Sequence, residues 1–271
     1  MTKIIAIANH KGGVGKTTTS YNLAHALAQD GGTKVLLCDV DPQAMLTKLL
    51  NFQPDALPAT LYHLLTPLQT PPAPAEVVRT TAMPGVFLIP AAADLARLEL
   101  ELASKINREL TLRRALASFT DFDFILLDCP PDLTVLNTSA LAAAHHVLIP
   151  VSSESMTLEA LYDFRATLEE VRAELNPDLT DRMVVTKHEA KTGHARAMLA
   201  ALQKAFPEQL YAAVIPYSVV AKDAAAAHES VLTFAPASSV AEAYRRLAGE
   251  VADSRPVPEP LGVPHKMNHH A

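Results

Sequence analysis

The stretch from His10 to Thr19, HKGGVGKTTT, constrains the fold of this chain more than any other, because it joins an apolar run to a helical pattern. The run from Ile4 to Ala8 precedes it, and residues 21–29 follow with helical spacing. This order predicts a strand, a glycine-rich loop and a helix. Three glycines allow the backbone to curl so that successive N–H groups point inward, and the helix adds its positive N-terminal end. A loop of this kind binds phosphate groups.

Two side chains of the loop suit a nucleoside triphosphate bound with magnesium. Lys16 would neutralise charge between the β- and γ-phosphates, and the Thr17 hydroxyl would ligate Mg²⁺ held against the same oxygens. The strict pattern G-x-x-x-x-G-K-[ST] begins with a glycine where this chain has His10, so the loop is a variant. It also contains a second lysine, Lys11, which either reaches a phosphate, its own or a second subunit's, or lies in solvent on a turn.

The segment KGGVGKTT resembles the deviant Walker A box of the ParA/MinD group of ATPases. The resemblance covers residues 3 to about 251, and it implies that Lys11 crosses a dimer interface to the partner's nucleotide. The residues that it assigns to ATP are Lys11, Gly12, Gly13, Val14, Gly15, Lys16, Thr17 and Thr18. It implies a P-loop fold. Apolar runs that alternate with helical patterns independently favour a doubly wound, mostly parallel α/β sheet of six to eight strands, with helices on both faces.

Two acidic residues, Asp39 and Asp41, follow the second apolar run. Carboxylates at the carboxyl end of a parallel strand lie where open α/β sheets place their ligands. Asp41 would orient the attacking water or accept its proton, and Asp39 would hold Mg²⁺ through water or shape the loop. Alternatively, both residues cap a helix beginning near Pro42. The motif DVDPQ is similar to the family's switch I, which implies the hydrolytic role for Asp41, although Ala44-Met45 replaces the Gly-Asn of many relatives.

A third acid, Asp128, ends the apolar run 122–128 in the arrangement of a Walker B element. Its carboxylate should accept a hydrogen bond from the water shell of Mg²⁺ or from the Thr17 hydroxyl. The alternative for a lone aspartate at a strand end is a turn or a cap. Because the loop, Asp41 and Asp128 occur in the order of a nucleotide site, we favour a metal site of Thr17, Asp39 and Asp128. Cys129-Pro130-Pro131 resembles the family's switch II, a rigid turn that senses the γ-phosphate.

Two later strands are predicted at 183–186 and 214–216, where relatives hold adenine. The resemblance therefore implies that Thr186 and Pro216 contact the base. Between the second and third acidic positions, residues 91–118 show helical spacing. We expect the apolar residues of this pattern to form a buried stripe, in particular Leu95, Leu98, Leu102 and Ile106.

Length and composition favour one domain in a reducing compartment. With 271 residues, 49% of them hydrophobic, residues 1–254 are expected to form a single ATPase domain and residues 255–271 a disordered, proline-rich tail. Cys38 and Cys129 are expected to be small core residues rather than a disulfide. No apolar stretch approaches the about 20 residues of a membrane span, and the N-terminus lacks the features of a signal peptide. These observations predict a cytoplasmic protein without membrane contact, and the resemblance implies that it associates with the nucleoid.

The net charge of −6 argues against a chain that is basic throughout, so any DNA binding must come from a local patch or from dimerisation. Residues 182–222 contain six cationic residues against two acidic ones. This basic region suits a phosphate-binding face whose field adds in a dimer, or else it is an ordinary solvated surface. ParA-like relatives bind DNA through basic residues near these positions. The resemblance thus implies contacts from Lys187, Lys191, Arg196 and Lys222, although arginines often found after the proline are missing here.

The resemblance implies a switch ATPase that segregates plasmid or chromosome DNA. ATP and Mg²⁺ would hold a homodimer on non-specific double-stranded DNA, and a ParB-like centromere-binding activator would stimulate slow hydrolysis. One alternative is a MinD-like membrane-cycling ATPase, which needs a C-terminal basic amphipathic helix, whereas residues 256–264 contain four prolines. Another is a metabolic P-loop enzyme such as dethiobiotin synthetase or the nitrogenase iron protein. The sequence has no dedicated small-substrate motif and no glycine-rich iron–sulfur setting.

Overall fold

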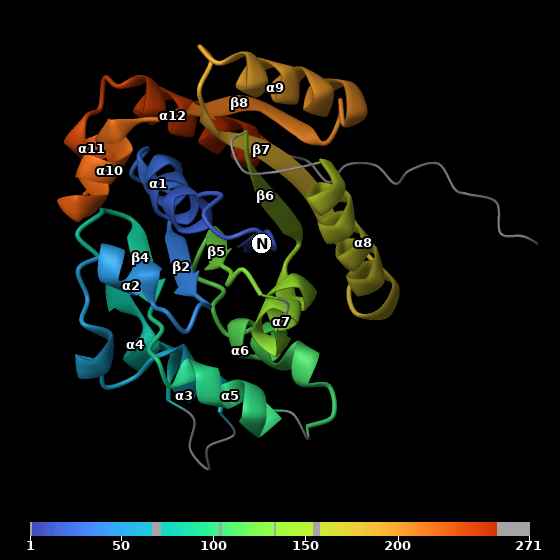
Figure 1. Ribbon diagram of the computed structural model, residues 1–271. Helices are drawn as coiled ribbons and strands as arrows, with labels where there is room; N and C mark the ends of the chain where they lie inside the picture. Colours follow the sequence, from blue (N-terminus) through green and yellow to red (C-terminus); the bar gives the residue numbers. More distant parts are fainter. Residues whose placement is uncertain (1, 67–71, 103–104, 133, 154–157, 254–271) are drawn as a thin grey trace, which may run out of the picture.

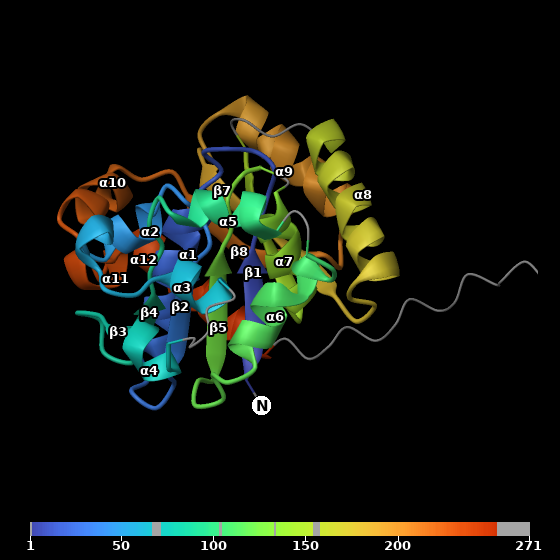
Figure 2. The same ribbon diagram turned by 90° about the horizontal axis from the view of Figure 1, so that it is seen from below.

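The computed structural model describes residues 2–66, 72–102, 105–132, 134–153 and 158–253, which form an eight-stranded sheet with helices on both faces (Figures 1 and 2). The strand order is β3-β4-β2-β5-β1-β6-β7-β8. All neighbours pair in parallel except β3 and β4. The predicted doubly wound, mostly parallel α/β fold is therefore confirmed.

The strands end together at one edge of the sheet. Asp128 pairs in register with Ile7 on one side and with Asp39 on the other, so the two acids and the start of the phosphate loop are neighbours. The strands are β1 (Lys3–Ile7), β2 (Val35–Asp39), β3 (Arg79–Thr80), β4 (Val86–Ile89), β5 (Phe124–Asp128), β6 (His146–Ser152), β7 (Thr180–His188) and β8 (Leu210–Pro216).

Helices connect the parallel strands. The α-helices are α1 (Lys16–Ala28), α2 (Met45–Leu49), α3 (Leu61–Leu65), α4 (Pro74–Val77), α5 (Leu95–Leu102), α6 (Thr111–Leu116), α7 (Val135–Ala143), α8 (Leu158–Glu174), α9 (Gly193–Ala205), α10 (Val219–Ala226), α11 (Val231–Phe234) and α12 (Ser239–Asp253). Among the described residues, short 3₁₀ turns lie in the connections at η1 (Pro54–Ala56) and η2 (Arg108–Leu110).

The core is divided into two layers by the sheet. Successive residues of a strand point to opposite faces of the sheet. Leu37 therefore belongs to the layer that includes Tyr21 of α1 and Tyr244 of α12. Its neighbour Leu36 belongs to the other layer, which includes Leu141 of α7 and Phe164 of α8. All six side chains are at most 2% exposed. Figure 1 shows α1 and α12 against one face and α7 and α8 against the other. Burial on both faces explains why the strands appear in the sequence as continuous apolar runs.

Three elements differ from the predictions. Helix α1 begins at Lys16, inside the phosphate loop motif, and the helix expected near Pro42 begins at Met45. The stripe expected over 91–118 is wrong at Ile106, which is 89% exposed, while Leu95 and Leu98 are fully buried as predicted. The reason is local: α5 ends at Leu102, and the left-handed Asn107 starts a new turn before α6.

The two cysteines, Cys38 and Cys129, are free and buried, in agreement with the sequence prediction. Within the described ranges, no helix combines the length and the apolar character needed to cross a bilayer. The proposed tail, residues 255–271, lies outside the described residues.

Candidate phosphate-binding site

The loop between β1 and α1 has the backbone shape of a phosphate cradle. Gly13 and Gly15 have φ angles of 75° and 92°, a region that residues with a Cβ rarely adopt. A Cβ on Gly13 would meet no atom within 4 Å, so the requirement for glycine here is conformational rather than steric. The Thr19 N–H donates to the Gly15 carbonyl (2.9 Å), and the free amides of the first turn of α1 therefore face the loop.

Lys16 holds its ammonium group inside this loop. The side chain is buried, and Nζ donates to the carbonyls of Asn9 (3.1 Å) and Lys11 (3.2 Å). These bonds use two of its three N–H donors and leave one for an anion. Burial lowers the pKa of Lys16, while the negative charge of Asp128 opposes that shift. Lys16 is thus a positioned, partly desolvated cation, which strengthens its attraction for a phosphate oxygen.

Asp128 meets two hydroxyl groups of α1. Ser20 Oγ donates to Asp128 Oδ1 (2.9 Å), and the Thr17 side chain also hydrogen-bonds the carboxylate. Burial raises the pKa of Asp128 to about 6, and these two hydrogen bonds act against that rise. The Thr17–Asp128 contact expected from the sequence is present. A hydroxyl and a carboxylate are hard oxygen donors of the kind that Mg²⁺ prefers, so this pair fits the metal, and magnesium binding itself stays a prediction.

Asp39 connects β2 to α2. It is fully buried, and its Oδ2 accepts from the N–H (2.8 Å) and the Oγ1 (2.7 Å) of Thr47. Its Oδ1 accepts from the Asp41 N–H at 3.3 Å. Burial, and then the charge of Asp128, raise the pKa of Asp39 to about 7. Of the roles expected for Asp39, these bonds support shaping the loop and capping the first turn of α2; its part in metal binding stays a prediction.

Asp41 lies beside the loop without capping α2. Its Oδ1 accepts from the Gln43 N–H (2.9 Å), which closes a local turn ahead of the left-handed Ala44 and the start of the helix. The charge of Asp41 acts to raise the pKa of both Lys16 and Asp128, which shows that the carboxylate is within electrostatic range of the loop. This position agrees with the predicted hydrolytic role, which stays a prediction.

The two residues that distinguish this loop have different environments. The His10 ring packs edge-to-face on Phe164 (4.6 Å between centroids), and burial, followed by the Lys16 charge, lowers its pKa. His10 therefore packs against α8 at the position where the strict motif has glycine. Lys11 is exposed, and its N–H donates to Asn9 Oδ1 (3.0 Å). The single chain thus leaves the Lys11 ammonium accessible, as a contact to a second subunit requires.

The end of β7 contacts the phosphate loop in a way that the sequence did not indicate. Thr186 is buried, and its hydroxyl donates to the Val14 carbonyl (2.7 Å). Lys187, predicted to bind DNA, donates from Nζ to the Gly13 carbonyl (2.6 Å). Pro216 pairs with His188 at the end of the neighbouring strand β8. The predicted base contacts of Thr186 and Pro216 stay predictions, but the Thr186 hydroxyl is already bonded to the loop.

The other cations of the basic region differ in how far they are committed to contacts within the chain. Arg182 lies over the Tyr211 ring (4.2 Å to the centroid) and donates to the Leu210 carbonyl. Arg196 is exposed and donates from Nη1 to the carbonyls of residues 190 and 191. Lys222 donates to the Tyr217 hydroxyl (2.9 Å). Lys191 and Lys204 are exposed on and beside α9.

Three contributors to the site escaped sequence reasoning: Asn9, Ser20 and Thr47. Asn9 joins the loop to β6, since its Nδ2 donates to the Pro150 carbonyl (2.8 Å). Ser20 could have been found, because it stands three residues after Thr17 and such spacing places both on one helix face. Asn9 and Thr47 had no comparable signal, since their contacts depend on how the strands are ordered.

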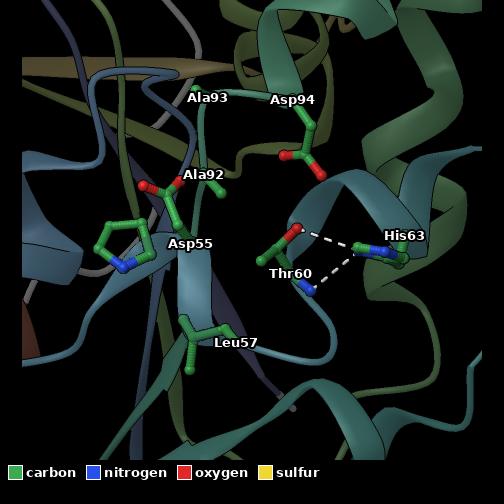
Figure 3. Close-up of a pocket in the computed structure, with 8 residues that line it drawn as sticks. Asp55, Leu57, Thr60, His63, Ala92, Ala93 and Asp94 are labelled. Atoms are coloured by element: carbon green, nitrogen blue, oxygen red, sulfur yellow. Dashed lines mark hydrogen bonds between the residues drawn. The ribbon is translucent and has the colours of Figure 1, made fainter.

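A separate cavity of about 210 Å³ lies near η1 and α3 and is lined by none of the loop residues (Figure 3). The His63 ring turns toward Thr60, where its Nδ1 meets both the backbone N–H and the hydroxyl at 3.2 Å. That ring therefore caps α3. Within the described part of the chain, no group of three or more His, Cys, Asp or Glu side chains could hold a metal ion there or elsewhere.

Comparison with known proteins supports a nucleotide site. Residues 2–181 match a family model described as an AAA domain. The sporulation initiation inhibitor protein Soj of Bacillus subtilis is 37% identical over 254 residues, which are 93% of this chain and 99% of that protein. The chromosome-partitioning ATPase Soj of Thermus thermophilus is 42% identical over 250 residues, 91% of this chain and 94% of that protein.

A solved structure gives the same result in three dimensions. The structure titled cobyrinic acid a,c-diamide synthase from Mycobacterium smegmatis, with bound ADP and magnesium, superposes with a TM-score of 0.81. It is 34% identical, and the match covers 95% of this chain and 98% of that one. The similarity thus extends over nearly the full length of both chains.

Proposed function

This chain belongs to the ParA/MinD-type family of P-loop ATPases, and on that premise we propose that it is a partitioning ATPase that segregates chromosome or plasmid DNA. Two similarities support this choice within the family: both Soj relatives match along more than nine-tenths of this chain. The observation that carries the chemistry is the buried Lys16 ammonium in the curled loop, beside the Thr17–Asp128 pair.

The proposed reaction is hydrolysis of ATP to ADP and phosphate. Residues of the loop from Lys11 to Thr18 bind the phosphates through backbone N–H groups, and Lys16 donates to the oxygens between the β- and γ-phosphates. Thr17 and Asp128, with Asp39 behind them, hold Mg²⁺, which when bound supplies positive charge to the same oxygens. Asp41 orients the attacking water and accepts its proton. Thr186 and Pro216 lie on the strands proposed to border the base.

The proposed output is a change of assembly. Lys11 is exposed on the loop and, in a homodimer, reaches the phosphates bound by the partner. Loss of the γ-phosphate removes the group that Lys16 of one copy and Lys11 of the other copy both contact, so the two copies separate. In the dimer, the exposed cations Lys191, Arg196 and Lys222 of two basic regions face non-specific double-stranded DNA. A ParB-like partner accelerates hydrolysis, and the protein works on the nucleoid in the cytoplasm.

The decisive experiment is to size the Asp41→Ala protein with ATP or ADP, each with and without duplex DNA. We expect turnover to fall by about 10²-fold or more, as for loss of a positioned general base, and the ATP-bound dimer to accumulate on DNA. Asp121→Ala, an exposed acid away from the loop, is the matched control and should behave as the unaltered protein does. A monomer in ATP, or DNA binding that is equal in ADP, would contradict the proposal.

A metabolic enzyme is the second candidate, because the Mycobacterium smegmatis structure bears the name of a diamide synthase. The two functions differ in what ATP turnover requires. A partitioning ATPase hydrolyses ATP without a small-molecule co-substrate and responds to DNA with a centromere-binding partner. A synthase would show turnover only with an acid and a nitrogen donor present. Measuring phosphate release with each addition separates them.

A further inference from the structure

Two consecutive residues at the end of β7 donate hydrogen bonds to two consecutive carbonyls of the phosphate loop. The Thr186 hydroxyl reaches the Val14 carbonyl at 2.7 Å, and Lys187 Nζ reaches the Gly13 carbonyl at 2.6 Å. The partners are 172 and 174 residues apart in sequence, so only the fold brings them together. A Lys187 side chain directed into solvent toward DNA would not make this bond.

The geometry of a peptide unit gives these bonds a consequence for phosphate binding. In a trans peptide the C=O and N–H point in opposite directions, and the chain has no cis peptide among the described residues. The Gly13 carbonyl shares its peptide with the Val14 N–H, and the Val14 carbonyl shares its peptide with the Gly15 N–H. Donors that hold the two carbonyls on the outer side of the loop therefore aim the two N–H groups at the inner side.

We propose that Lys187 is a positioning residue of the phosphate loop, which fixes the Gly13–Val14 peptide so that the Val14 N–H faces the nucleotide phosphates. Thr186 does the same for the next peptide. Glycine peptides rotate easily. A loop that becomes ordered only when the nucleotide binds incurs an entropic cost, which lowers its affinity for the nucleotide. The proposal rests on the proposed nucleotide site, and it removes Lys187 from the predicted DNA contacts.

The backbone at Lys187 supports this role independently. Its φ is 49°, in the left-handed region that is unfavourable for a residue with a Cβ. The pairing of β7 with β8 shifts register between Val185 and His188, so the chain leaves the regular ladder at this residue. Ser153 Oγ donates to the Lys187 carbonyl at 3.3 Å and holds the turn from the β6 side. The strained turn directs the side chain toward the loop.

The test compares Lys187→Ala and Lys187→Arg with a matched control, Lys204→Ala, an exposed lysine of the same basic region. Calorimetry measures the equilibrium affinity of each protein for a non-hydrolysable ATP analogue in the presence of Mg²⁺. We expect about tenfold weaker binding for Lys187→Ala, the effect of one lost hydrogen bond to an ionised group. Lys187→Arg, which keeps a cationic donor, should restore most of the affinity, and Lys204→Ala should leave it unchanged.

Two further readouts separate positioning from other roles. Amide hydrogen exchange at Val14 and Gly15 should be faster in Lys187→Ala before nucleotide is added, while exchange in β5 stays as in the unaltered protein. At saturating analogue, Lys187→Ala should bind duplex DNA as the unaltered protein does. Normal nucleotide affinity together with weakened DNA binding at saturation would overturn the proposal and return Lys187 to the DNA surface. Failure of the unaltered protein to bind the analogue would instead overturn the proposed function.

Discussion

The phosphate loop and the basic region 182–222 were both identified from the sequence, yet the structure treats them differently. In the loop, Lys16 and Thr17 occupy the positions that the motif predicts, with Asp128 beside them. In the basic region, cations that look alike in sequence have different environments. Arg182 lies on the Tyr211 ring and Lys187 lies on the loop, whereas Lys191 is exposed.

The difference reflects two kinds of information. A motif with fixed spacing encodes geometry, because a glycine-rich turn and a helix start place each side chain within a few ångströms. A count of charges encodes only composition, since a lysine or arginine side chain is long enough to reach carbonyls, rings or solvent from the same backbone position. The net charge of a segment is therefore a weaker guide to a binding surface than the contacts of each cationic group.

The largest expected effect tests the loop half of this comparison. Lys16→Ala removes a buried cation that already bonds the loop at the Asn9 and Lys11 carbonyls. We expect Mg²⁺-ATP affinity to fall by about 10²-fold or more, since a charge-assisted contact in a partly desolvated site is lost together with the order of the loop. Calorimetric titration with a non-hydrolysable analogue measures it.

The control for this change is Lys105→Ala, an exposed lysine near the start of η2. It should bind the analogue with unaltered affinity. If Lys16→Ala also bound normally, the motif would have identified a loop of the right shape without a phosphate site, and the contrast with the basic region would disappear.

The sequence predicted the strands and the loop because their signals are local. Strands β1, β2, β5 and β6 each contain a continuous apolar run, and Thr17 lies next to Lys16 in one motif. The remaining features depend on tertiary structure. Thr47 bonds Asp39 across eight residues, and Lys187 bonds Gly13 across 174, so neither follows from spacing. Ile106 was misplaced because the apolar periodicity continues past Leu102, the residue at which α5 ends.

The second prediction tests the basic region by comparing two arginines. Arg196→Ala removes an exposed guanidinium, and we expect about tenfold weaker binding to duplex DNA in the ATP state. The slope of log affinity against log salt concentration should become smaller in magnitude by about 1. Arg182→Ala removes a guanidinium that lies over the Tyr211 ring. Its DNA affinity and salt slope should stay unchanged. Fluorescence anisotropy at several salt concentrations measures both.

Equal losses for the two arginines would mean that the summed charge of the region, rather than the placement of each group, sets DNA affinity. Because the Arg182→Ala protein has lost a packed side chain, its thermal unfolding must be recorded beside its DNA binding. A lowered melting temperature with normal DNA affinity is the pattern that supports the comparison.

The smallest expected effect concerns the buried contacts behind Arg182. His146 is 5% exposed, with Nδ1 at 2.8 Å from Thr180 Oγ1 and Nε2 at 2.9 Å from the Tyr211 hydroxyl. Burial, then the charges of Lys3 and Arg182, lower its pKa to about 3. Below its ordinary pKa the unfolded chain takes up a proton that the folded protein excludes, so His146 makes the free energy of unfolding fall as the pH drops from 6.5 toward 3.

His146→Gln removes this titration and leaves the other groups in place, so the difference in unfolding free energy between the two proteins isolates it. That difference should shift by about 1 kcal/mol in favour of the variant when the pH falls from 7 to 5.5. Urea unfolding at both pH values measures it, and His194→Gln, an exposed histidine of α9, should show no such shift. A pH-independent difference would mean that the folded protein accepts the proton. The Arg182–Tyr211–His146 contacts would then be open to water, and Arg182 would belong with the exposed cations after all.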